Sequence, residues 1–374
     1  MSKKIKQVFV CSLILLFFLF TKSSLVLAED RVFLDLSLEF LDSYELEETT
    51  YAETLVGGLS GITYNSANDE YYTISDDRSV ESPARFYTLK IDLDNNKINE
   101  VKIEGVTLLK KQSGELYPRD SIDGEGIAFS PRNSVFISSE GVSNKGVAPF
   151  INEYDLAGNF LSEIPIPQRY IYDQEEGKGI QNNYGFESLT IKANGTVKED
   201  PFRLFSATEL ALTQDFDRQN IDSLLRSRLM HYVVNPVGSP VLIAEHLYPV
   251  KKPDFGVIVN GLSSLFALPQ EGYLLSLERT LGVRGFGAKI FQIVMGNASD
   301  IYNEKSLAGN IDNINPVKKK LVLDLQDLGI RLDNLEGMTF GARLPDGSQS
   351  LILVSDDNFA PQRQKTQFLL FKVQ

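Results

Sequence analysis

The sequence predicts an all-β fold, a β-propeller of four-stranded antiparallel blades, on three observations. A short apolar strand with serine or glutamate at its second position occurs five times along the chain. Each copy is followed, after a turn, by a second apolar strand that ends in an acidic residue. The copies are 65, 62, 76 and 73 residues apart, which is enough chain for four strands and their loops. Four-stranded units arranged radially are the blades of a propeller.

The first two strands of each repeat are the most regular part of the pattern. The opening strands are LSGITY (59–64), GEGIAF (124–129), FESLTI (186–191), LSSLFA (262–267) and LEGMTF (335–340). The second strands are YYTISDD (71–77), SVFISSE (134–140), RLFSATE (203–209), YLLSLER (273–279) and LILVSDD (351–357). One copy alone would be an ordinary hairpin, whereas five copies predict a repeated architecture.

Two further strands follow the hairpin in each of the first four repeats, but the fifth has only QFLLFKV (367–373) before the chain ends. We expect RVFLDLSLEF (31–40) to supply the missing strand and so to close the last blade. This arrangement favours five blades. Six blades are the alternative, if the long third or fourth repeat contains a degenerate blade. Helical signal is sparse, and the best candidate is 219–229.

The first 28 residues have the pattern of a secretory signal peptide. Lys3, Lys4 and Lys6 precede the apolar run 8–20, and small residues lead to a cleavage site after Ala28. An uncleaved anchor is the alternative, but 13 apolar residues are short of the roughly 20 that span a bilayer. We therefore expect one propeller domain over 29–374, secreted or periplasmic, with no membrane insertion after cleavage.

Composition limits the chemistry. Cys11 is the only cysteine and lies in the signal, so the mature chain has no disulfide, thiolate ligand or cysteine nucleophile. The net charge is −13, and loss of the signal with its four lysines and no acid makes it −13 − 4 = −17. This charge argues against nucleic acid or anionic lipid as a partner. We expect a monomer that acts on a small anionic ester.

Acidic residues mark one end of the predicted channel. In an antiparallel hairpin the start of the first strand and the end of the second lie at the same edge of the sheet. Because the first strand is innermost, acids from all five blades should surround one mouth: Asp76, Asp77, Glu125, Glu140, Glu187, Glu209, Glu278, Glu336, Asp356 and Asp357. Crowded carboxylates resist ionising together, and a hard cation relieves this repulsion.

We assign roles to these acids as hypotheses. Glu125 and Glu336 are the predicted catalytic proton acceptors, with Arg279 as an oxyanion-binding partner, and the other eight acids are predicted ligands of Ca²⁺, with Mg²⁺ as the alternative ion. The structural alternative is that the acids bond to backbone N–H groups and arginines and so hold the blades together. The two histidines, His231 and His246, both lie within predicted strands of the third repeat and the mature chain has no cysteine, which argues against a zinc site.

Basic residues follow the acidic strand ends in every repeat. They are Arg78, Arg85, Lys145, Arg218, Arg226, Arg228, Arg279, Arg284, Arg363 and Lys365. Guanidinium groups bind two oxygens of a phosphate or carboxylate at once, so these residues suit an anionic substrate. Simple charge balancing is the alternative. The chain has no G-x-S-x-G elbow and no phosphate-binding P-loop.

Four segments of the chain also carry a family resemblance. DGEGIAF (123–129), YGFESLTI (184–191), LLSLER (274–279) and DNLEGMTFGARLPDGSQSLILVSDDNF (333–359) resemble the phytase-like family described as esterase-like activity of phytase. The likeness covers most of the mature chain and is loosest in the first repeat, where Ser60 stands in place of glutamate. It implies a secreted propeller related in architecture to calcium-dependent alkaline phytases. It assigns no catalytic residues.

Three functions therefore remain open at the level of sequence. The first is a metal-dependent hydrolase of phosphate esters or related small esters. The second is a non-catalytic propeller of the cell envelope that holds a ligand or a partner at the same mouth. The third is a metal-dependent lactonase or other sugar-acid hydrolase, which a propeller with one central cation would also serve.

Overall fold

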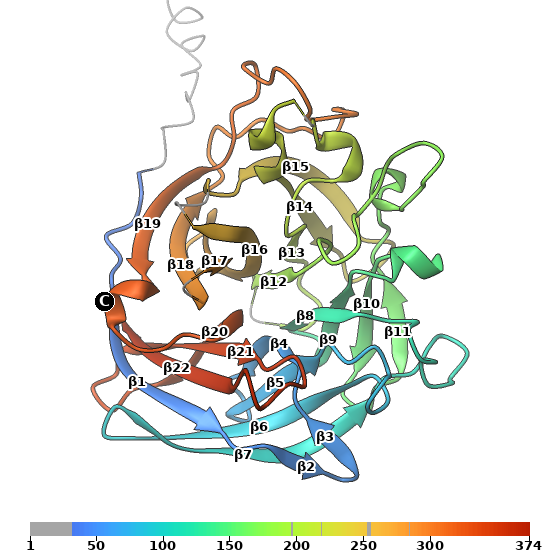
Figure 1. The fold of residues 1–374 in the computed structure, drawn as a ribbon. Coiled ribbons are helices and arrows are strands. Elements are labelled where there is room, and N and C mark those ends of the chain that lie inside the picture. The colour runs from blue at the N-terminus through green and yellow to red at the C-terminus, as the bar shows by residue number, and fades with distance from the viewer. Residues whose placement is uncertain (1–31, 196, 218, 253–255, 284) are drawn as a thin grey trace, which may run out of the picture. The chain divides into compact units, whose positions relative to one another are not determined.

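The computed structural model describes residues 32–374 except 196, 218, 253–255 and 284. Residues 33–374 form one compact unit (Figure 1). The predicted signal peptide, with its cleavage site after Ala28, lies outside the described residues. Within the described part of the chain, no helix is both long enough and apolar enough to cross a membrane.

Five four-stranded antiparallel sheets make up the propeller (Figure 1), as the repeats predict. Blade 1 contains β4 (Leu59–Asn65), β5 (Glu70–Ser75), β6 (Arg85–Asp94) and β7 (Lys97–Leu108). Blade 2 contains β8 (Gly124–Phe129), β9 (Ser134–Ser139), β10 (Phe150–Asp155) and β11 (Phe160–Glu163). Blade 3 contains β12 (Ser188–Ala193), β13 (Phe202–Ala207), β14 (Arg226–Val234) and β15 (Val241–Pro249). Blade 4 contains β16 (Val257–Ala267), β17 (Tyr273–Gly282), β18 (Gly285–Val294) and β19 (Lys318–Asp324).

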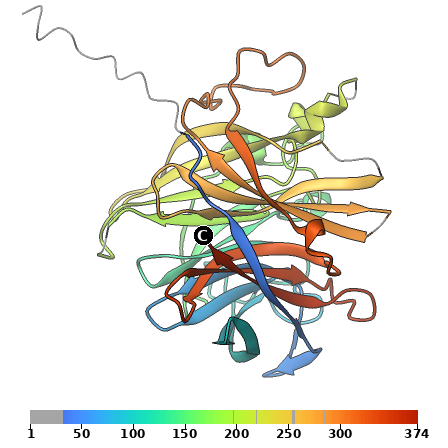
Figure 2. The same cartoon turned by 90° about the vertical axis from the view of Figure 1, so that its left-hand side faces the viewer.

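Blade 5 combines both ends of the described chain. It contains β20 (Asn334–Arg343), β21 (Gln349–Asp356), β22 (Thr366–Val373) and, as its outer strand, β1 (Leu38–Leu46). Figure 2 shows β1 in blue beside the C-terminal strands in red. The N-terminal strand is thus confirmed, but it begins at Leu38 and not at residue 31. Leu38 is the partner of Val373, the last residue of β22, and backbone hydrogen bonds between Ser37 and Gln374 extend the pairing by one residue.

The smaller elements of the described residues are one hairpin and five short 3₁₀ helices. The hairpin is β2 (Thr49–Tyr51) with β3 (Thr54–Val56), and the helices are η1 (Ser143–Lys145), η2 (Gln168–Tyr170), η3 (Thr213–Asp215), η4 (Ile221–Leu225) and η5 (Leu325–Leu328). The helix predicted over 219–229 is wrong. A single 3₁₀ turn forms at η4, and from Arg226 onward the chain pairs with β15, because strand pairing outweighs local helix propensity there.

The inner strands contact one another in the cyclic order β4, β8, β12, β16, β20 and back to β4. Glycines allow this close approach. A Cβ on Gly61 would lie 2.5 Å from the carbonyl oxygen of Glu125, and one on Gly126 would lie 2.7 Å from Cβ of Leu189. Apolar clusters fill the space between neighbouring sheets, so the starts of the inner strands are held in fixed positions around the channel.

A buried ion pair fixes blade 3 to the segment that precedes β14. The Arg228 guanidinium donates to both carboxylate oxygens of Asp215, at 2.6 and 2.9 Å, and lies 3.4 Å from Glu245. All three side chains are fully buried. The Tyr170 hydroxyl donates to Glu245 at 2.9 Å, so this network also holds η2 against the blade.

Asp215→Asn should therefore destabilise the protein by about 3 to 5 kcal/mol, because it leaves the buried Arg228 cation with half its compensation. Urea unfolding followed by circular dichroism measures the change. Asp222→Asn is the matched control, since Asp222 is exposed and its ion pair is with the exposed Lys252. Its free energy of unfolding should stay within about 0.5 kcal/mol of the parent. Equal effects of the two substitutions would contradict the structural importance of the buried pair.

Candidate metal centre at the channel mouth

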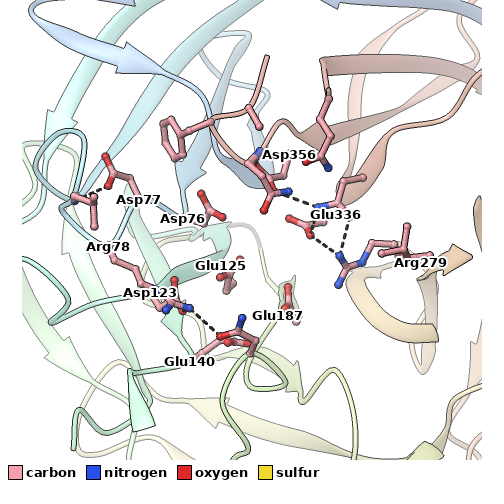
Figure 3. Close-up of a pocket in the computed structure, with 18 of the residues that line it drawn as sticks. Asp76, Asp77, Arg78, Asp123, Glu125, Glu140, Glu187, Arg279, Glu336 and Asp356 are labelled. Atoms are coloured by element: carbon pink, nitrogen blue, oxygen red, sulfur yellow. Dashed lines mark hydrogen bonds and ion pairs between the residues drawn. The ribbon is translucent and has the colours of Figure 1, made fainter. Parts of the chain in front are cut away.

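A cavity of about 800 Å³ lies where the inner strands start and the second strands end. We call it the mouth pocket. All five blades or their loops line it, through Asp76, Asp77, Arg78, Val80, Glu81, Asp123, Glu125, Glu140, Asn183, Glu187, Arg279, Leu281, Phe286, Asn334, Glu336, Asp356, Asn358, Phe359, Ala360, Arg363 and Gln364. Eight of the eleven predicted site residues are among them. Figure 3 shows the labelled carboxylates gathered around this pocket from several blades.

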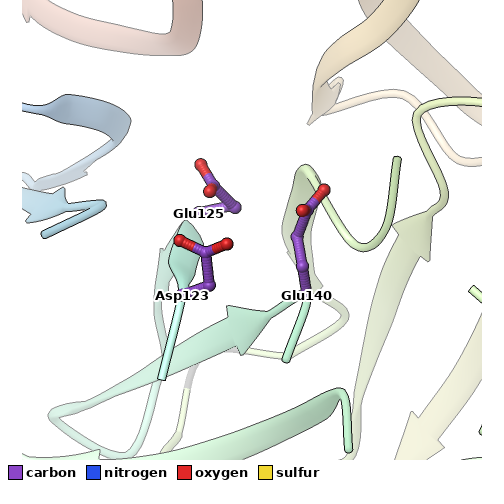
Figure 4. Close-up of side chains that lie close together, drawn as sticks. All are labelled: Asp123, Glu125 and Glu140. Carbon is purple, nitrogen blue, oxygen red and sulfur yellow. The ribbon is translucent and has the colours of Figure 1, made fainter. Parts of the chain in front are cut away.

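Three of these carboxylates form a tight group that we call the carboxylate triad: Asp123, Glu125 and Glu140. Each offers an oxygen, and these oxygens all lie within 4.8 Å of one another (Figure 4). The hairpin of β8 and β9 builds the triad, because Asp123 directly precedes β8, Glu125 lies within it and Glu140 follows β9. The backbone N–H of Glu140 donates to the carbonyl of Asp123 at 3.1 Å, which fixes the two strand ends together.

Asp123 is the member of the triad that is not among the predicted site residues. It lies in the DGEGIAF segment, two residues before Glu125. Residues two apart in an extended chain face the same side, and this spacing could have identified it.

The triad has little compensating positive charge. The Arg78 guanidinium lies 2.5 Å from Asp123, and the Gly185 N–H donates to Glu140 at 2.6 Å. Burial and neighbouring carboxylates raise the pKa of Glu140 to about 8 and that of Glu125 well above its usual value. Burial also raises the pKa of Asp123 to about 6, although Arg78 opposes the rise. Three carboxyls around one guanidinium therefore leave a site that a divalent cation would neutralise.

A second group of acids faces the triad across the pocket. The Asn334 amide donates to Glu336 at 2.8 Å and to Asp356 at 3.2 Å, and so holds both side chains in place. Burial is the main cause that raises the pKa of Glu336 to about 8 and that of Asp356 to about 7. These carboxyls, like those of the triad, are crowded enough to disfavour simultaneous ionisation.

Asp76 interacts with acids of both groups, and no cation pairs with it among the described residues. Burial raises its pKa well above the usual value, and the Asp356 and Glu336 carboxyls add to this rise. Its Oδ1 atom is buried with no hydrogen-bond partner among the described residues. That oxygen packs over Gly58, where a Cβ would lie 2.1 Å away and where φ is +62°. An uncompensated buried oxygen beside other carboxyls is what a cation-binding region would present.

Arg279 connects blades 3, 4 and 5 at the pocket wall. Its guanidinium donates to Glu209 at 2.7 Å and to the Asn334 side-chain oxygen at 2.7 Å, and lies 3.2 Å from Glu336. These anions raise the pKa of Arg279 further. Glu209 is thus an arginine partner outside the pocket lining. Glu187, a pocket-lining acid, has a raised pKa because of burial and its neighbours Glu140 and Glu209.

Three other predicted ligands are held by structural partners. Asp77 lines the pocket, yet it binds Arg85 at 2.7 Å and caps three backbone N–H groups of residues 80–82. Glu278 binds the Tyr248 hydroxyl at 2.7 Å and the Lys319 ammonium. Asp357 accepts from the backbone N–H groups of Gly58 and Phe359 and from the Thr366 hydroxyl. For these three acids the geometry matches the structural alternative.

The basic residues predicted in the loops also fall into two groups, those that line the pocket and those that bind structural partners. Arg78, Arg279 and Arg363 line the mouth pocket, whereas Arg85 and Arg228 bind buried acids and Arg226 donates to backbone carbonyls. Lys145 binds Asp120, and Arg218 and Arg284 lie outside the described residues. His231 and His246 lie in β14 and β15 and are not among the pocket-lining residues. They contact Arg203 and the Ser299 carbonyl respectively.

Comparisons with known proteins give one family match. The family model described as “Phytase-like: Esterase-like activity of phytase” matches residues 54–359. No curated protein matches the sequence.

Among solved structures the chain is similar to a thermostable family-43 glycoside hydrolase, with 10% identity, a TM-score of 0.45 and coverage of 86% of this chain and 91% of that one. It is also similar to the Bacteroides ovatus xyloglucan PUL GH43B, with 13% identity, a TM-score of 0.43 and coverage of 87% and 53%. The chain thus spans about half the length of the latter. These likenesses carry no argument about function.

The crowded carboxyls predict an unusual dependence of stability on pH in the absence of metal. Glu140 and Glu336 each have a pKa of about 8 in the folded protein and an ordinary value of 4.5 in the unfolded chain. The folded state therefore binds the proton more tightly, and protonation of these carboxyls stabilises it. That contribution is complete below pH 4.5 and is lost as the pH rises through 8. With a chelator present, the melting temperature should therefore be lower at pH 8 than at pH 6, as scanning calorimetry will measure.

Calcium should reverse this loss. At 100 times its Kd it should raise the melting temperature by about 5 °C at pH 8, and by less at pH 6. Glu125→Gln, which removes one crowded carboxyl, should flatten the pH dependence. A melting temperature that rises between pH 6 and pH 8 and does not change with calcium would contradict a cation site in the mouth pocket.

Proposed function

Because the chain belongs to the phytase-like family described as esterase-like activity of phytase, we propose that it is a metal-dependent hydrolase of small esters, with phosphate esters as the main candidates. The observation that supports this most is the carboxylate triad, a buried group of hard oxygen ligands with too little positive charge around it. The proposed ion is Ca²⁺, because oxygen-only sites with several carboxylates suit it, and Mg²⁺ is the alternative.

The residues present fit such an ion. Asp123, Glu125 and Glu140 would hold it, and the unpartnered oxygen of Asp76 adds further negative charge beside them. A bound divalent cation supplies charge stabilisation for a substrate oxyanion and acidifies a bound water. The sequence hypothesis gave Glu125 as a proton acceptor, but its place in the triad favours a ligand role for it.

Glu336 is then the better proton acceptor of the two predicted carboxylates. Its pKa of about 8 is close to that of an effective general base at neutral or mildly alkaline pH. Asn334 and Arg279 fix its orientation, at 2.8 and 3.2 Å. In the hydrolysis the water oxygen bonds to phosphorus or to the acyl carbon, the bond to the alcohol oxygen breaks, and the alcohol leaves with a proton.

The arginines of the pocket would bind the anionic part of the substrate. Arg78 lies beside the triad with its side chain 29% exposed, so a substrate oxygen can reach its guanidinium. Arg279 has a side chain 18% exposed and already contacts Glu209 and Glu336. Guanidinium groups in such a low-dielectric site stabilise the negative charge that develops during hydrolysis.

A non-catalytic binding propeller is the second candidate, and one observation favours it. Arg279 is engaged by Glu209, Asn334 and Glu336, so it is committed to holding the pocket wall and is less available for an oxyanion. In that case calcium would stabilise the protein without any turnover.

Hydrolysis should be detected on at least one of aryl phosphates, phytate, aryl acetates and lactones, with calcium present, and should be lost with chelator. Glu125→Gln and Glu336→Gln should each lower kcat/KM by about 100-fold or more. Glu163→Gln is the matched control, since Glu163 is an exposed carboxylate at the end of the outer strand of the same blade as the triad. Inactivity on all four substrates with and without calcium would refute the hydrolase and leave the binding function.

We also propose that the protein is exported and acts as a monomer on a small anionic ester. The support is the pattern of residues 1–28 and the acidic charge of the remainder. Mass spectrometry of the protein recovered outside the cytoplasm should give a chain that begins at Glu29. Recovery of the full-length chain in a membrane fraction would instead support an uncleaved anchor.

A further inference from the structure

The mouth pocket has an apolar wall above its carboxylates. It consists of Val80, Leu281, Phe286 and Phe359, which come from the loop after β5, from β17 and β18, and from the loop after β21. Val80 and Leu281 are 39% and 38% exposed, although both are large apolar side chains. Exposed apolar side chains that line a pocket are available to an apolar part of a ligand.

In blade 4, two residues of this wall lie next to Arg279. Arg279 and Leu281 are two residues apart in β17, so they face the same side of the strand, about 7 Å apart along it. Leu281 is paired across the sheet with Phe286 of β18, and so the two apolar side chains lie together. A ligand whose anionic end is near Arg279 would therefore have its neighbouring atoms against Leu281 and Phe286.

The charge of the pocket limits how many anionic groups a ligand can carry. The described lining residues include nine carboxylates and three arginines. Arg78 and Arg279 are already paired with acids, which leaves little positive charge for additional phosphates. One divalent cation at the carboxylate triad would offset only two of these charges. A polyphosphorylated ligand would therefore still place most of its phosphates near other acids of the pocket, and like charges at short range repel.

We propose, on the basis of the hydrolase function proposed above, that the substrates are amphiphilic monoesters. One anionic group binds at the acidic floor of the pocket, and an alkyl or aryl group lies against Val80, Leu281, Phe286 and Phe359. Esters that carry several phosphates are poor ligands of this site.

Alkylphosphonates test this inference independently of turnover, because their P–C bond is not hydrolysed. Methyl-, butyl- and octylphosphonate are titrated into the calcium-loaded mature protein by calorimetry, with phytate as the polyanionic comparison and calcium kept in excess. Affinity should rise about two- to fourfold for each methylene that the wall covers. In the variants Leu281→Ser and Phe286→Ala, the gain in affinity per methylene should be smaller, while the affinity for methylphosphonate stays unchanged.

Val283→Ser is the matched control, since Val283 is 79% exposed at the end of the same strand pair and is not among the pocket-lining residues. Leu281→Met, which keeps the apolar contact, should retain the increment and thereby separates loss of the wall from loss of folding. Affinity independent of chain length, tighter binding of phytate than of octylphosphonate, or no binding of any phosphonate would each overturn the proposal. Affinity that rises with chain length, together with no hydrolysis of octyl phosphate, would refute the hydrolase function but support amphiphilic anions as the ligands of the pocket.

Discussion

Electrostatic repulsion among buried carboxyls at the channel mouth is the constraint on which the rest of this structure depends. The rigid ring of inner strands brings Glu125, Glu187 and Glu336 toward one another, although more than 200 residues separate the first from the last. Packing of the inner strands and of the sheets against one another fixes these strand ends, so the carboxyls cannot move apart. The stability of the ring therefore makes an unfavourable local arrangement persistent, and a persistent arrangement of this kind is the usual basis of a cation or catalytic site.

The same mouth contains two classes of acid, and their partners distinguish them. Asp77, Glu278 and Asp357 have a cation or backbone N–H groups at hydrogen-bonding distance, and they hold loops and strand ends in place. The triad and Asp76 are less compensated, and burial shifts their pKa values upward. The structural interpretation of the acidic ring thus applies to the first class, and the metal-site hypothesis rests on the second. The ion-paired acids hold the loops and strand ends that position the triad and Asp76.

The repeat pattern made the fold predictable, because each blade must bury its strands against its neighbours and so repeats the same apolar periodicity. The position of the acids at one end followed from hairpin geometry alone. The division between ion-paired acids and less compensated acids did not follow, since it depends on partners such as Arg85 and Lys319, which lie in other strands and whose pairing the sequence pattern does not specify. Asp123 does not follow from the repeat pattern, because that pattern marks the second position of the inner strand and Asp123 precedes the strand.

Closure of blade 5 has a consequence for how the chain acquires its structure. The backbone groups of Ser37 and Gln374 bond to each other at 3.0 and 3.1 Å, across a sequence separation of 337 residues. The first strand to be synthesised therefore has no partner until the last one has been made, and long-range pairing of this kind is intrinsically slow. Until that moment the outer edge of β22 and the whole of β1 are open strand edges, which are prone to pair with other chains. Pairing of β1 with β22 thus both completes the ring and removes the open edges at which the newly made chain could aggregate.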